Sequence, residues 1–116
     1  MGDSFRDLHV WQRAIQMTLS VYRLTEEFPK QEMFGLISQM RRASVSVASN
    51  VAEGYGRNST GEYKQFLGMA RGSNSELETQ IVIARGLGYG EVQRLKETED
   101  LCIEVGKMLR AMLQKL

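Results

Sequence analysis

Residues 31–53 read QEMFGLISQMRRASVSVASNVAE, and the pattern of apolar side chains in this stretch decides the fold of the chain. Apolar residues recur at spacings of three and four, which places them on one face of an α-helix, and the strict alternation of a half-buried β-strand is absent. We therefore predict a helix over residues 31–53. Its inward side chains are predicted to be Met33, Leu36, Ile37, Met40, Ala43, Ser44, Val47 and Val51.

Glycine, proline and serine mark the ends of the predicted helices. Gly54-Tyr55-Gly56 is expected to end the helix over residues 31–53, because glycine accepts the left-handed geometry of a helix C-cap at little cost. Pro29 ends the preceding helix, since the residue before a proline is pushed out of the helical region. Ser59 followed by Glu62 matches a capping box, which predicts that another helix begins at residue 60.

The same three-four spacing runs through the rest of the chain. It predicts helices over about residues 7–27, 31–53, 60–86 and 91–115. Matched lengths and short connections favour antiparallel neighbours. We predict that residues 1–116 form one all-α domain, an antiparallel up-and-down four-helix bundle.

Composition excludes several classes of protein. Fifteen basic residues against fourteen acidic ones give no pervasive basic field, so any nucleic-acid site has to be a local cluster. A single cysteine, Cys102, permits neither an internal disulfide nor a cysteine-based metal site. The first residues contain no apolar signal core, and no apolar run approaches membrane-spanning length. We expect a cytoplasmic protein that does not contact membranes.

The predicted helix over residues 31–53 carries more apolar surface than one core needs. Placed at about 100° per residue, Val45, Ala48 and Ala52 extend its apolar arc well beyond the inward seam. A helix with so little polar perimeter is usually covered on more than one side, and exposed apolar patches commonly mark partner surfaces. This predicts self-association. The alternative is that small alanine and serine side chains simply tolerate solvent.

Gly68 and Gly72 lie one turn apart within the predicted helix over residues 60–86. Each mid-helix glycine costs about 0.8–1 kcal/mol relative to alanine, and the close approach of another helix would offset that cost. Neighbouring acidic and amide side chains could complement the arginines of the preceding helix, within or between subunits, or could form a solvated face. The predicted subunit-interface residues are Gln39, Arg42, Ser46, Asn50, Glu53, Gly68, Gly72, Ser73 and Glu76.

Three separated blocks of the sequence match a known family in order. They are FRDLHVWQRA at residues 5–14, GL at 35–36 followed by QMRRASVSVASNVAEGYGR at 39–57, and EYKQFL at 62–67 with ARGS and ELETQ at 70–73 and 76–80. The chain resembles, over roughly residues 5–90, the bacterial four-helix bundle proteins encoded in intervening sequences of 23S ribosomal RNA genes. It departs from them at Asn74, where family members usually carry a bulky apolar residue.

The resemblance implies a four-helix subunit that assembles into a ring, typically a pentamer. The family is similar to the accessory variability protein of diversity-generating retroelements, a pentameric barrel that binds nucleic acid and a reverse transcriptase. A head-to-tail ring agrees with helices that offer apolar surface in two directions.

The best candidate nucleic-acid residues are a basic set that a ring would repeat around its axis. They are Arg41, Arg42, Arg57, Lys64 and Arg71. Repetition multiplies a weak phosphate site. The alternative is structural, with Arg42 paired to Glu53 or Glu76 in an interface. No RNA-reading signature is present, so sequence-specific readout is not expected.

No residue pattern predicts catalysis, a cofactor or a metal ion. His9 is the only histidine and is expected at the surface near a helix start, without the partner and cleft that acid–base chemistry needs. Cys102 falls on the inward seam of its helix, where a cysteine acts as a small hydrophobe. Trp11 and Tyr22 are expected in the core.

Three functional hypotheses remain. The first is a non-enzymatic homo-oligomer, pentameric if it follows the resemblance, that assists in binding RNA or a nucleoprotein. The second is a structural scaffold that docks a protein partner without nucleic acid. The third is an enzyme whose site forms only between subunits.

Overall fold

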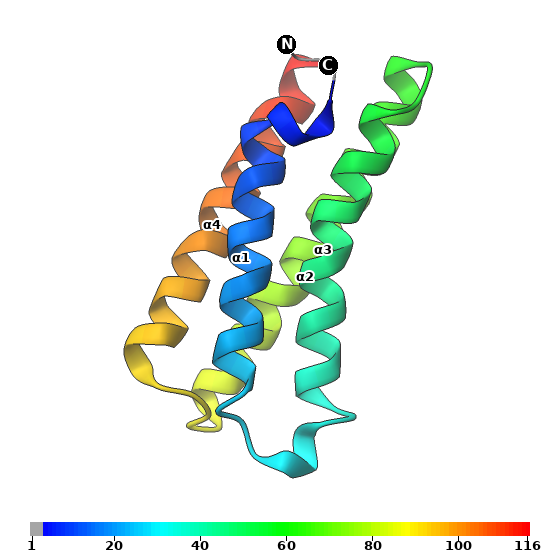
Figure 1. Ribbon diagram of the computed structural model, residues 1–116. Helices are drawn as coiled ribbons and strands as arrows, with labels where there is room; N and C mark the ends of the chain where they lie inside the picture. The colour runs from blue at the N-terminus through cyan, green and yellow to red at the C-terminus, as the bar shows by residue number, and fades with distance from the viewer. Residues whose placement is uncertain (1–3) are drawn as a thin grey trace.

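Four long helices make up most of residues 4–116, the part of the chain that the computed structural model describes (Figure 1). Two short 3-10 helices, η1 and η2, precede the first and second of them. The elements are η1 Phe5–Asp7, α1 His9–Thr25, η2 Lys30–Glu32, α2 Leu36–Tyr55, α3 Thr60–Gly86 and α4 Val92–Lys115.

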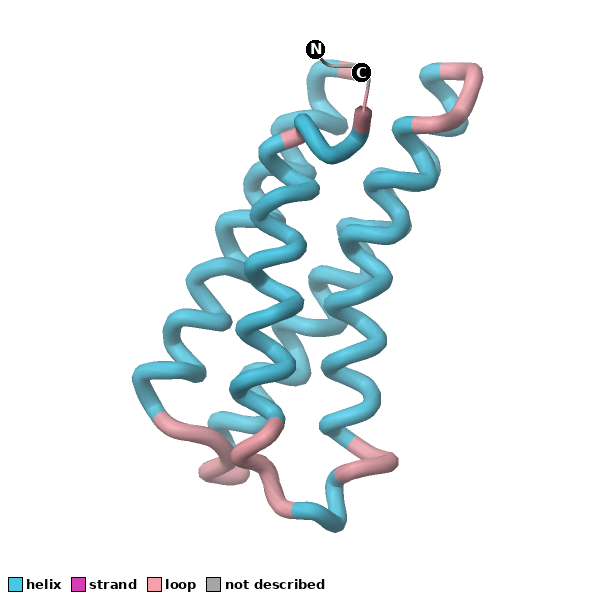
Figure 2. Tube along the Cα trace, viewed as in Figure 1, coloured by secondary structure: helices cyan, strands magenta, loops and turns pink. Residues whose placement is uncertain are grey.

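The helices form an antiparallel up-and-down bundle. α1 packs against α2 and α4, α3 packs against the same two helices, and the most extensive packing is between α2 and α3. Figures 1 and 2 show the α1–α2 and α3–α4 connections at one end, with the α2–α3 turn at the other end together with the two termini. The predicted fold class is therefore confirmed.

One apolar core runs the length of the bundle. Each helix contributes an inward stripe at spacings of three and four, as the sequence predicts, and many of these side chains are fully buried. Burial of a Leu, Met or Val side chain contributes about 1.5–3 kcal/mol. The largest fully buried apolar residues are Met17, Val21, Leu24, Met40, Val47, Val51, Leu67, Leu77, Ile81, Val105 and Leu109.

The predicted start of the second helix is wrong. α2 begins at Leu36, five residues later than expected, because Gly35 interrupts the helical backbone with φ −110° and ψ −113°. The Glu32 carboxylate accepts a hydrogen bond from the Leu36 N–H at 3.1 Å and so caps the helix from the preceding turn. Met33, predicted inward, is consequently 48% exposed.

The other boundaries lie close to the prediction. α1 begins at His9 rather than at residue 7 because Leu8, extended at ψ 126°, separates it from η1, and it ends at Thr25. α3 begins at the predicted residue, and the Ser59 hydroxyl accepts the Glu62 N–H at 3.1 Å, as a capping serine does. α4 is preceded by Glu91, whose carboxylate accepts the N–H groups of Gln93 and Arg94 at 3.0 Å. These bonds lower the pKa of Glu91.

Gly54 has a different role from the predicted one. α2 continues through it to Tyr55, and the C-cap residue Gly56 has φ −83°, so neither glycine adopts the left-handed conformation. Gly54 is buried, and a Cβ atom there would lie 2.8 Å from the Cβ atom of Phe66 on α3. The glycine therefore permits the close approach of α2 and α3.

A buried polar contact joins α3 to α4 within the apolar core. The Asn74 side chain is 3% exposed, and its Nδ2 donates to the Cys102 carbonyl at 2.9 Å. The Cys102 thiol donates in return to Asn74 Oδ1 at 3.4 Å. The facing helix thus meets the hydrogen bonds of the buried Asn74 amide. Burial also raises the pKa of the Cys102 thiol to about 12.

We expect Gly54→Ala to lower the free energy of unfolding by about 1–3 kcal/mol, because the new methyl group overlaps Phe66. Denaturant titration followed by circular dichroism measures this change. Gly86→Ala is the control, since a Cβ atom at Gly86 meets nothing within 4 Å and alanine favours helix. Equal stability of the two variants would contradict the proposed role of Gly54.

We expect the Cys102 thiol to react very slowly with a disulfide reagent in the folded protein. With a pKa of about 12, on the order of one thiol in ten thousand is ionised at pH 8. The unfolded thiol ionises near its ordinary pKa of 9.0, so stability should fall as pH rises from about 9 toward 12. Cys102→Ala should flatten that decline. If the Cys102 thiol reacted as fast in the native protein as in denaturant, this result would contradict its burial.

Candidate interaction surfaces

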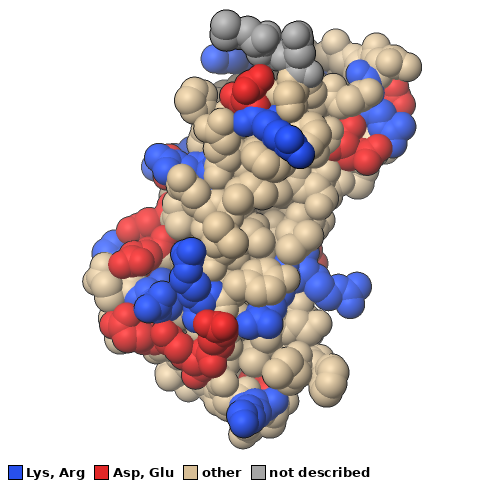
Figure 3. Space-filling view, in the orientation of Figure 1, with Lys and Arg blue, Asp and Glu red and all other residues tan. Residues whose placement is uncertain are grey.

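A shallow apolar groove follows the contact between α1 and α2. Its volume is about 240 Å³, and its lining is mostly aliphatic and aromatic. Figure 3 shows the same face as Figure 1, with a band free of charged side chains across the middle of the α1–α2 surface. The lining residues are Trp11, Ile15, Thr18, Val45, Ala48, Ser49 and Ala52.

The predicted excess of apolar surface on α2 is present in part. Val45 is 43% exposed and Ala52 is half-buried, whereas Ala48 is buried against the bundle. Tyr22, predicted in the core, is instead 40% exposed on α1. Phe34, in the turn before α2, is 96% exposed, an unusual position for a phenylalanine.

A second, polar groove lies between α2 and α3 and has a volume of about 520 Å³. Five of the predicted interface residues line it: Gln39, Arg42, Ser46, Ser73 and Glu76.

Hydrogen bonds hold the floor of this polar groove. The Ser46 and Ser73 hydroxyls lie 2.9 Å apart across the two helices, and Asn50 Nδ2 donates to the Ser46 carbonyl at 2.9 Å. The buried amide oxygen of Gln80 accepts no hydrogen bond from any described residue.

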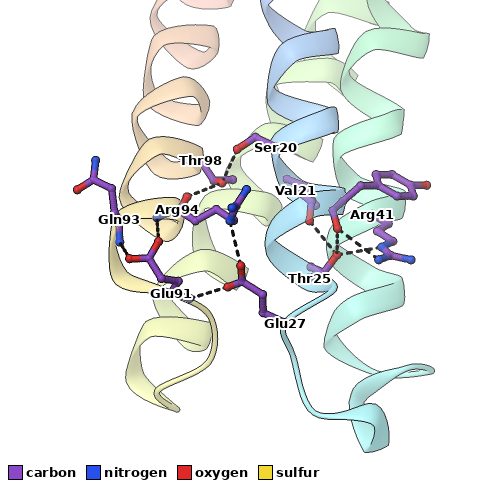
Figure 4. A network of polar contacts seen from close by, with 10 residues as sticks. Ser20, Val21, Thr25, Glu27, Arg41, Glu91, Gln93, Arg94 and Thr98 are labelled. Atoms are coloured by element: carbon purple, nitrogen blue, oxygen red, sulfur yellow. Dashed lines mark hydrogen bonds and ion pairs between the residues drawn. The ribbon is translucent and has the colours of Figure 1, made fainter.

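Two of the predicted basic residues are already engaged within the subunit. Arg41 donates through Nε to the Thr25 hydroxyl at 2.9 Å and lies 4.6 Å over the Tyr22 ring, which ties α2 to the end of α1 (Figure 4). Arg57 pairs with Glu53 at 2.8 Å and lies 4.7 Å over the Phe66 ring. Both arginines therefore have partners within the subunit. Glu53, one of the two partners predicted for Arg42, pairs with Arg57 instead.

The other three predicted basic residues are exposed and form no ion pair within residues 4–116. Arg42 lines the polar groove beside Glu76 but forms no ion pair with a residue of the described range 4–116. Lys64 and Arg71 are exposed on α3. The structure does not bring the five basic residues together in one cluster.

Gly68 and Gly72 lie on the exposed surface of α3. A Cβ atom at either position would meet nothing within 4 Å. The close helix approach predicted at these glycines is therefore not made inside one subunit, and the space beside them is open.

The end that carries the α1–α2 and α3–α4 connections is rich in paired charges. The Glu27 carboxylate accepts the Glu91 N–H at 2.7 Å and pairs with Arg94 Nε at 2.9 Å (Figure 4). Arg85 pairs with Glu99 nearby along α3 and α4. Arg85 and Arg94 are thereby neutralised by the protein itself.

His9 and Cys102 are the two residues that the sequence analysis weighed for catalysis, and both lie where it expects them. His9 is exposed at the first position of α1, as predicted, and shares a groove with Arg13, which pairs with Glu104 at 2.8 Å. Cys102 is fully buried, also as predicted.

Among the described residues no group of three His, Cys, Asp or Glu side chains could hold a metal ion. No helix in this range is both long and apolar enough to cross a membrane.

Sequence reasoning missed two basic residues of α4. Lys107 and Arg110 line a groove of about 250 Å³ between α3 and α4, together with the predicted Arg71. Their spacing of three places them on one helical face. This spacing is visible in the sequence, but only the packing of α4 against α3 shows that this face of α4 lies beside Arg71.

Comparison with known proteins gives a family and a similar fold. Among solved structures, the chain resembles a protein of unknown function from the S23 ribosomal protein family of Bacteroides thetaiotaomicron, with a TM-score of 0.80 and 17% identity over 90% of this chain and 97% of that one. None of the curated proteins matches. Residues 6–111 match the family model of the 23S rRNA-intervening sequence protein. The chain therefore belongs to the 23S rRNA-intervening sequence protein family.

Proposed function

We propose that this protein is a non-enzymatic, cytoplasmic homo-oligomer, pentameric as the resemblance implies, that assists in binding RNA or a nucleoprotein. The observation that carries this proposal is the uncharged α1–α2 groove with the half-exposed Val45 at its edge. Apolar surface of this kind is stabilised when a second molecule removes it from water.

Several features of α2 and α3 support an oligomer built from two unlike faces. The α1–α2 side offers apolar contact, whereas the α2–α3 side offers polar side chains. Gly68 and Gly72 leave room for another helix to approach α3. Two different faces on one subunit suit a head-to-tail contact, which closes into a ring when the rotation allows it.

The charge distribution supports weak binding of a polyanion rather than sequence readout. Arg42, Lys64 and Arg71 remain exposed and unpaired within the described range, so each could neutralise a phosphate group. A ring repeats such a set in every subunit, and binding at several weak sites on one RNA multiplies the affinity.

A scaffold that docks a protein partner is the second candidate, and Phe34 favours it. This ring is almost entirely in solvent and borders the polar α2–α3 groove. Aromatic anchors of this kind are enriched at protein–protein interfaces.

We expect the purified protein to have a multiple of the single-chain mass in light scattering, and Val45→Glu to shift it to the single-chain mass. A carboxylate buried in an apolar contact loses its hydration without gaining a partner. Val92→Glu is the control, because Val92 is 83% exposed at the start of α4 and a carboxylate there favours the helix dipole. A wild-type protein that stays a single chain at high concentration would remove the oligomer from the proposal.

We expect the wild-type protein to bind single-stranded RNA with an affinity that falls steeply as salt rises. Fluorescence anisotropy of a labelled RNA between 50 and 200 mM salt, roughly the range over which phosphate contacts are weakened, measures this dependence. Arg42→Gln with Lys64→Gln should weaken binding several-fold, while Arg41→Gln should not, since Arg41 is held by Thr25 and Tyr22. Absent or salt-independent binding, with the oligomer intact, would favour the protein scaffold.

A further inference from the structure

We propose that the groove between α3 and α4 is a phosphate-binding site for the RNA backbone, formed by Arg71, Lys107 and Arg110. This inference rests on the proposed RNA binding and assigns it to a place that the basic residues of α2 do not occupy. The groove has a volume of about 250 Å³ and is lined by both helices.

Helix geometry gathers the three cations at one end of this groove. Arg71, Asn74 and Glu78 lie on one face of α3 at spacings of three and four residues. Asn74 contacts Cys102 and would lie 3.1 Å from a Cβ atom at position 106. Because α3 and α4 run antiparallel, Arg71 lies on the same side of Asn74 as residues 107 to 110, and the acidic Glu78 lies on the other side.

No residue of the described range 4–116 neutralises the three cations. Arg71, Lys107 and Arg110 form neither an ion pair nor a hydrogen bond with another residue in the part of the chain that the structure describes. Arg85 and Arg94, at the opposite end of α3 and α4, each pair with a glutamate. Like charges gathered at one end of the groove repel one another, and a bound anion removes that repulsion.

The groove supplies suitable chemistry for a phosphate group. Two guanidinium groups offer planar pairs of N–H donors that match two phosphate oxygens, and the lysine adds a compact positive charge. The buried Asn74 and the exposed Ser75 add polar groups to the lining. Gly106 contributes no side chain, which keeps the floor of the groove open.

The test is RNA binding by a triple variant, Arg71→Gln, Lys107→Gln and Arg110→Gln. Glutamine keeps the helix propensity of lysine and arginine, so the bundle should remain folded by circular dichroism. We expect binding of a labelled single-stranded RNA to weaken at least about tenfold at 0.1 M salt, roughly the concentration at which phosphate contacts still dominate. The slope of log affinity against log salt should decrease by about 2 for each subunit that contacts the RNA.

The matched control removes three positive charges from the other end of the bundle, with Arg23→Gln, Lys30→Gln and Lys96→Gln. This control should retain most of the affinity and the salt slope. Inorganic triphosphate should displace RNA from the wild-type protein and have less effect on residual binding by the groove variant, which would show that the groove recognises phosphate itself.

Two outcomes would overturn the inference in distinguishable ways. If the wild-type protein binds RNA and both triple variants lose affinity equally, the α3–α4 groove is not the site, while the RNA-binding function stands. If the wild-type protein binds no RNA at any salt concentration tested, the proposed function and this site fall together.

Discussion

The close approach of α2 to α3 is the constraint on which the rest of the structure depends. Gly54 removes the one Cβ atom that would collide with Phe66, and the Ser46 and Ser73 hydroxyls bridge the same two helices farther along. Because α2 is seated so close to α3 and also packs on α1, it borders a groove on each side, one polar and one apolar. Both candidate interaction surfaces therefore follow from small side chains on one helix.

Periodicity predicted the fold because a helical seam is a local property of the chain. The spacing of apolar residues placed the four helices and most of the core, and Ser59 marked the start of α3. The start of α2 could not be found in this way, since apolar residues continue through Met33 although the backbone is interrupted at Gly35. The role of Gly54 depends on a side chain of another helix, which no local pattern contains.

The candidate sites were less predictable because charge pairing depends on tertiary neighbours. Arg41 and Arg57 looked equivalent to Arg42 in the sequence, yet the first two are held by aromatic rings and polar groups that only the folded bundle brings near them. Lys107 and Arg110 were overlooked because they form a basic groove only together with Arg71, which lies on the helix that faces them. Five of the predicted interface residues share one groove, and their place in a subunit interface stays a prediction.

The amide of Asn74 also limits how α3 and α4 can be aligned. An entirely aliphatic seam tolerates sliding, because one branched side chain replaces another with little loss. Here a shift of one turn, about 5.4 Å, would carry the amide away from the Cys102 carbonyl and leave it in hydrocarbon, at a cost of about 1–3 kcal/mol. A buried amide of this kind selects a single register between the two helices, as buried asparagines do in coiled coils, and it costs some packing energy.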